Sequence, residues 1–144
     1  MGPRLLLLIS LILIPSCASY RPISQDGKTP IYPIDSKDIP KAVASLALVF
    51  TDFSMERKAL EPREDERSGT VNFGILFKAA TGKQEDGKTV DGIVFLTRTK
   101  IRGKESRPGQ RKQTVEVIER FQGKVAKKLA EIAEPVYVIS YTLD

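Results

Sequence analysis

Three stretches of the chain distribute apolar residues in the manner of β-strands. From Val71 to Phe77, apolar side chains occupy every second position, which predicts a half-buried strand. A second run is apolar from Ile93 to Leu96, and alternation continues to Arg102. The third run, Val136 to Leu143, is rich in β-branched residues and tyrosine, which favour strands. A loop of about ten residues separates the first two runs, so we expect a long hairpin.

A helical pattern lies between the second and third runs. Six apolar residues recur at spacings of three or four, which places them on one side of a long amphipathic helix that Pro135 ends. Gly123 costs this helix about 1 kcal/mol relative to alanine, so the helix depends on packing against a sheet. The six residues are Val115, Ile118, Phe121, Val125, Leu129 and Ile132.

Together these elements predict an α+β fold in a single domain over residues 41–144. We expect a small antiparallel sheet of three to five strands, with one long C-terminal amphipathic helix packed on one face. The stretch 42–53 is ambiguous, because its first half fits a helix and Leu48–Phe50 fits a strand. We expect a strand in its second half.

Residues 17–40 contain four prolines and few aliphatic residues, which predicts a Pro-containing tether ahead of the domain. An extended chain of this length reaches up to about 70 Å at about 3.1 Å per residue. The alternative is an irregular arm that packs on the domain through Tyr32 and Ile34. The sequence does not decide between the two.

The N-terminus carries an export signal pattern. Arg4 precedes the run from Leu5 to Ile14, in which Ser10 is the only residue that is neither Leu nor Ile. As a helix this run would span about 15 Å, half of the roughly 30 Å hydrocarbon core of a bilayer. The pattern therefore predicts a signal peptide over residues 1–16 rather than a membrane-spanning helix.

The signal segment ends in Leu13-Ile14-Pro15-Ser16-Cys17, with an aliphatic residue three before the cysteine and a small residue just before it. This segment resembles the lipobox of bacterial lipoproteins, although Pro15 stands where Ala, Ser or Thr is usual. The resemblance implies cleavage before Cys17 and a thioether from its sulfur to diacylglycerol. A further acyl chain such as palmitate would be added to the freed amine in many species.

The lipobox also bears on location. Lipoproteins of the enteric type that stay at the inner membrane usually carry Asp after the cysteine, so Ala18 favours the outer membrane. The alternative is an ordinary signal peptide, cut at an A-x-A-like site near residues 17–19, with Cys17 a bystander. The only cysteine of the chain lies at the end of the hydrophobic run, where the modification needs it, and this position favours lipidation.

Composition excludes several chemistries. The 144 residues include no histidine and one cysteine, so His-based catalysis, His-ligated zinc and an internal disulfide are excluded. We expect that the protein is not an enzyme and that it binds no cofactor and no metal ion. Residues 82–89 match the P-loop pattern, but they lead into an apolar strand and place Glu85 and Asp86 where phosphate would sit. We therefore expect no nucleotide. The charged run 61–67 predicts a solvated loop.

The chain has a net charge of +5, and seven Lys or Arg against one Glu lie in residues 98–112. If the strand runs through residue 104, alternate basic residues project from one face. This stripe could meet an envelope protein or the headgroup of an anionic glycolipid or phospholipid. Alternatively it is a solvated strand end that protects a sheet edge. Nucleic acid is not expected, because no aromatic residues interleave with the charges. The stripe residues are Arg98, Lys100, Arg102 and Lys104.

The pattern as a whole predicts a lipid-anchored protein of the bacterial cell envelope. Its domain would be non-catalytic, binding another envelope component or supporting an assembly. The alternative is a carrier or sensor that holds a lipid or other amphiphile between helix and sheet. That alternative predicts a buried apolar cavity, whereas the first hypothesis predicts a filled core.

Overall fold

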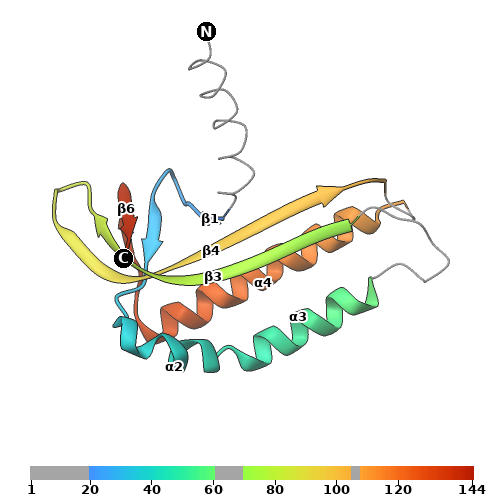
Figure 1. Ribbon diagram of the computed structural model, residues 1–144, viewed down its shortest axis with the longest axis horizontal. Coiled ribbons are helices and arrows are strands. Elements are labelled where there is room, and N and C mark those ends of the chain that lie inside the picture. The colour runs from blue at the N-terminus through green and yellow to red at the C-terminus, as the bar shows by residue number, and fades with distance from the viewer. Residues whose placement is uncertain (1–19, 61–69, 105–107) are drawn as a thin grey trace, which may run out of the picture.

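A computed structural model describes residues 20–60, 70–104 and 108–144 (Figure 1). Three of the expectations above lie outside these residues. They are the signal peptide over residues 1–16, the lipid attachment at Cys17 and the solvated loop over residues 61–67. The described part is a mixed α and β fold, as the sequence predicted.

The centre of the fold is one long antiparallel hairpin. Strand β3 (Thr70–Lys83) pairs with β4 (Thr89–Arg102) over their whole length, from Thr70 opposite Arg102 to Lys83 opposite Thr89. The connection is a short turn over residues 84–88, with Gly87 at a φ of 88°. The hairpin is present as expected, but the expectation of a loop of about ten residues is wrong, because both strands continue towards the turn.

Two glycines explain why these continuations were missed. Gly82 and Gly92 suggest a loop in the sequence, but here they leave room for other parts of the chain. A Cβ atom on Gly82 would lie 2.5 Å from Cδ1 of Ile31, and one on Gly92 would lie 2.1 Å from the carbonyl oxygen of Tyr32. Both are strand glycines that a close approach requires.

The hairpin belongs to a sheet of four antiparallel strands in the order β1-β4-β3-β6. Strand β1 (Arg21–Pro22) joins the β4 edge, and β6 (Ser140–Leu143) joins β3 near the turn. A separate pair is formed by β2 (Thr29–Ile31) and β5 (Val136–Val138). The third predicted strand run is thus divided between two sheets at Ile139, whose backbone N–H donates to the Lys83 carbonyl over 2.8 Å.

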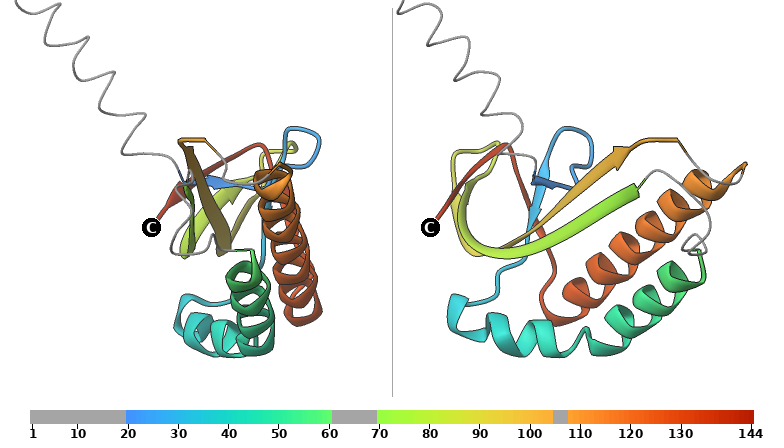
Figure 2. Two further views of the ribbon diagram at one scale, coloured as in Figure 1. Left: turned by 90° about the vertical axis from the view of Figure 1, so that its right-hand side faces the viewer. Right: turned by 45° about the vertical axis from the view of Figure 1, so that its right-hand side comes forward.

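The long C-terminal helix α4 (Gln110–Ile132) packs against one face of the sheet, which confirms the prediction (Figure 2). A second helix, α3 (Ala47–Ala59), runs beside α4 and follows the short helices η1 (Ser36–Asp38) and α2 (Ile39–Ala44).

The strand expected in the second half of residues 42–53 is therefore wrong. Leu46, Val49, Phe50 and Phe53 follow a helical spacing, and they pack with Phe121 of α4 in one cluster. This contact with α4 gives the stretch a buried helical face, which overrides the local strand preference of its apolar residues.

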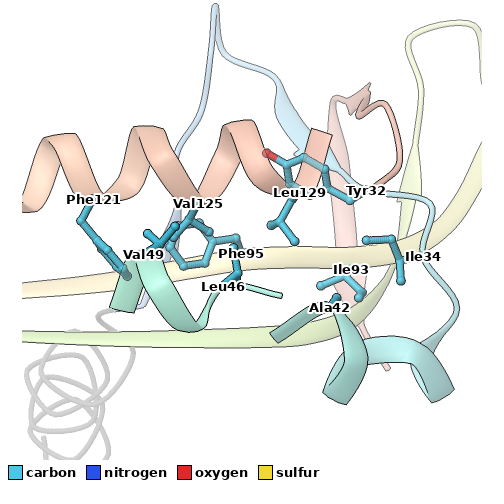
Figure 3. Close-up of a cluster of buried hydrophobic side chains, with 10 residues drawn as sticks. All are labelled: Tyr32, Ile34, Ala42, Leu46, Val49, Ile93, Phe95, Phe121, Val125 and Leu129. Carbon is cyan, nitrogen blue, oxygen red and sulfur yellow. The ribbon is translucent and has the colours of Figure 1, made fainter. Parts of the chain in front are cut away.

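Helices and hairpin enclose the main core (Figure 3). Phe121 stacks on Phe53 with ring centroids 4.1 Å apart, and it meets Phe73 of β3 edge-on at 5.8 Å. A second, smaller core lies on the other face of the sheet, where Ile31 and Val138 pack on Val94 and other residues of the hairpin. Strand β4 is therefore buried on both faces from Gly92 to Thr97.

The described residues of the expected tether pack on the domain instead. Tyr32 and Ile34 are buried, as the alternative of a packed arm expected. Tyr32 also exchanges two backbone hydrogen bonds with Ile93 of β4, at 2.9 and 2.8 Å. The domain boundary expected at Lys41 is therefore wrong: the fold already includes β1, and its described part begins at Tyr20.

Candidate functional site

The sheet face turned away from α4, which we call the distal face, is defined by the pairing of β3 and β4. Odd-numbered residues such as Phe73 and Phe95 pack into the core beneath α4. Directly paired residues of antiparallel strands share a face, and side chains alternate between faces. The distal face therefore consists of the even-numbered positions, 72–82 in β3 and 90–102 in β4.

The distal face has four basic residues and no acidic residue at these positions. Arg98, Lys100 and Arg102 follow one another along β4, as the sequence predicted, and Lys78 adds a fourth cation from β3. Arg98 is half-buried and the other three are exposed. Lys78 was missed because its place on this face depends on the strand register, which no local pattern reveals. We call these four residues the basic group.

Lys104 does not continue the stripe. Strand β4 ends at Arg102, and Gly103 takes a φ of 74°, a left-handed conformation that turns the chain. The guanidinium of Arg111 in α4 donates to the Gly103 carbonyl and ties this bend to the helix. Lys104 is exposed beyond the bend, so the prediction that all four basic residues share one strand face is wrong at this position.

Arg111 and Lys112, two further basic residues of the stretch 98–112, belong to a different element. Arg111 and Lys112 lie in the first turn of α4, where they line a shallow surface hollow with Ile101 and Glu116. They belong to the helix side of the sheet, because Ile101 is an odd-numbered position of β4. The local excess of positive charge seen in the sequence is thus spread over two surfaces.

Tyr20 lies on the distal face beside the basic group. Its ring centroid is 4.9 Å from Cζ of Arg98, a cation–π contact. The ring also covers Gly74, where an added Cβ would lie 2.4 Å from the tyrosine hydroxyl. The described chain therefore starts against the basic group and then enters β1, where Pro22 pairs with Leu96.

The distal face is covered only in part. Near the turn, Ala80, Val94 and Leu96 are buried under the second core. Towards the other end, Asn72, Lys100 and Arg102 are exposed. Arg98, Lys100 and Arg102 thus lie on the part of this face that the second core leaves open, whereas Lys78, opposite the buried Val94, is exposed beside that core.

The P-loop match has strand and turn geometry. Gly82 and Lys83 end β3, and Thr89 begins β4, so no helix follows the glycine-rich segment. The backbone N–H of Lys88 donates to a carboxylate oxygen of Asp86 at 3.0 Å, as in an ordinary turn. This segment lacks the helix N-terminus that a phosphate cradle needs.

A cavity of about 350 Å³ opens at the edge of the layer between α4 and the sheet. Apolar and polar groups both line it, and Tyr32 and Tyr137 contribute their rings. The Tyr137 hydroxyl donates to Oε1 of Gln25 at 3.1 Å. The volume of this cavity lies at the lower end of the range for small-molecule sites. The lining residues are Ile23, Ser24, Gln25, Pro30, Tyr32, Phe95, Ala126 and Tyr137.

Tyr32 makes the stability of this region sensitive to alkaline pH. Burial, with a smaller contribution from the nearby Tyr137, raises the pKa of Tyr32 above its usual 10.0. As the pH rises through 10, the tyrosine hydroxyl loses its proton in the unfolded chain before it does so in the folded protein. The folded state therefore becomes less stable above about pH 10. We expect Tyr32→Phe to flatten the fall in unfolding free energy above that pH. Urea unfolding between neutral and alkaline pH measures the free energy of unfolding of both proteins. An equal fall in wild type and variant would contradict the prediction.

Among the described residues, no three or more Cys, Asp or Glu side chains gather in a way that could hold a metal ion. Within residues 20–60, 70–104 and 108–144, no helix is long and apolar enough to cross a membrane. No protein-family model, curated protein or solved structure matches this chain.

Proposed function

We propose that this chain is a lipid-anchored protein of the bacterial cell envelope, located at the outer membrane. Its domain is non-catalytic and binds another envelope component or supports an assembly. The observation that carries the proposal is the place of Cys17, the only cysteine, three residues after the end of a hydrophobic run too short to span a bilayer. Two or three acyl chains on this residue would hold the protein on a membrane almost permanently.

The packed core supports a binding domain over a lipid carrier. A carrier needs a buried cavity between helix and sheet, but Phe95, Phe121 and Val125 fill the space between α4 and the hairpin. The cavity beside Tyr32 keeps the carrier as a second candidate, restricted to a small amphiphile. Native mass spectrometry of the purified protein tests it: a copurifying small molecule that Ala126→Phe abolishes favours a carrier.

Metabolic labelling with a fatty acid tests the proposal. The wild-type protein should take up label and sediment with membranes, because lipid on Cys17 is its anchor. Cys17→Ala should take up none. Ser16→Ala is the matched control, because it keeps a small residue before the cysteine, and it should label like wild type. An unlabelled wild-type protein contradicts the proposal.

A further inference from the structure

We infer that the basic group of the distal face lies against the anionic phospholipid headgroups of the membrane that holds Cys17. The inference rests on the proposed lipid anchor and adds an orientation to it. Its site consists of the row Arg98, Lys100 and Arg102, with Tyr20 in contact with Arg98 and Lys78 farther along the same face.

A short connection joins Cys17 to the distal face. Cys17 precedes Tyr20 by three residues, so their Cα atoms can be separated by at most about 11 Å. Tyr20 lies on the distal face, in contact with Arg98. The helices α3 and α4 lie on the other side of the sheet (Figure 2). To turn the helices towards the lipid, this short connection would have to pass around the sheet edge, whereas turning the distal face towards the lipid requires no such path.

The distal face carries positive charge along its two long strands. Four cations and no carboxylate occupy its strand positions. Each Lys or Arg near an anionic bilayer favours the bound state by about fivefold. This attraction falls off within a Debye length of about 8 Å at physiological salt, so it acts only when the face is held close to the headgroups. The short connection to Cys17 would provide that proximity.

The cations of β4 are evenly spaced along the strand. Alternate side chains of a strand stand about 6.8 Å apart, so Arg98, Lys100 and Arg102 form a row rather than converge on one point. A row suits many separate headgroup phosphates better than a single bound anion. Tyr20 adds an aromatic ring of the type that is enriched at the membrane interface.

The experiment uses the full lipidated protein, purified from bacterial membranes and reconstituted in phosphatidylcholine vesicles with or without phosphatidylglycerol. A fluorophore is placed at Asn72→Cys on the distal face or at Asp52→Cys on the exposed side of α3. A quencher attached to lipid headgroups reports which probe lies near the bilayer. The mass of each preparation shows whether Cys17 carries lipid.

We expect the Asn72 probe to be quenched several-fold more than the Asp52 probe when phosphatidylglycerol is present. Reversing Arg98, Lys100 and Arg102 to Glu should remove this difference, because the loss of three attractions alone lowers the ratio of the two orientations by about a hundredfold and the new carboxylates add repulsion. Reversing Lys37, Lys41 and Lys127, which are exposed on the helices, makes the same change in net charge and should preserve it.

Each other outcome overturns the inference in a distinguishable way. Equal quenching at the two positions in a lipidated protein rejects the orientation and leaves the anchor intact. A difference that survives the triple reversal rejects headgroup attraction and leaves this face to an acidic protein partner. A protein without lipid on Cys17 rejects the anchor and the orientation together.

Discussion

Gly92→Ala is expected to destabilise the domain by about 3 kcal/mol. The new Cβ would lie 2.1 Å from the Tyr32 carbonyl oxygen and 2.9 Å from Cγ2 of Ile31. The carbonyl cannot move freely, because it accepts the hydrogen bond from the backbone N–H of Ile93. The substitution therefore separates residues 31 and 32 of the N-terminal arm (residues 20–40) from β4, and it disturbs both cores. Urea unfolding of the two proteins measures the change.

Gly123→Ala is the matched control, because it is the same chemical change at an open site. Gly123 lies within α4, and nothing outside the local helix backbone lies within 4 Å of the Cβ it would gain. Alanine should stabilise the helix by about 1 kcal/mol through its higher helix propensity. Equal stability of Gly92→Ala and wild type would show that the arm does not pack on β4 as described.

Phe121→Ala is expected to cost about 3 to 5 kcal/mol. Phe121 is 2% exposed, and its ring meets three other rings, from α3 and from β3. Removing it leaves a cavity where both helices and the hairpin meet. Lys127→Ala, at an exposed position of the same helix, should change stability by less than about 0.5 kcal/mol. Thermal and urea unfolding compare them, and a small loss for Phe121→Ala contradicts the packing of α3 on α4.

The elements that sequence predicted well are those whose pattern is local. The alternation from Val71 to Phe77 and the stripe on α4 can be seen without knowing what they contact. Helix α3 was missed because Leu48-Val49-Phe50 satisfies a strand pattern over a short window. The spacing of Leu46, Val49 and Phe53 was the available signal for a helix, and it needed a longer window than the apolar run itself.

The N-terminal arm could not be placed from its composition. The prolines of this arm favour an extended chain, and β2 is extended. The strand with which β2 pairs, β5, is far away in sequence. Thr29 pairs with Val138 and Tyr32 bridges to Ile93. A strand as short as β2 is too short to show a periodic pattern of apolar residues. The sequence of a packed arm therefore cannot be distinguished from the sequence of a tether.

The candidate site shows the same limit. The row from Arg98 to Arg102 follows from the two-residue period of one strand, whereas Lys78 and Tyr20 join it through register and through the path of the chain. Lys104 was included because the strand was expected to continue. Gly103, with its left-handed backbone, was the signal that it stops.

The central claim is that the sulfur of Cys17 carries the lipid that holds this domain on a membrane. Mass spectrometry of the intact protein, purified from bacterial membranes, tests it most directly. The account predicts a chain that begins at Cys17 and is heavier than its amino acids by a diacylglyceryl group, with or without a further acyl chain. A free thiol at Cys17, or residues 1–16 still attached, would contradict it.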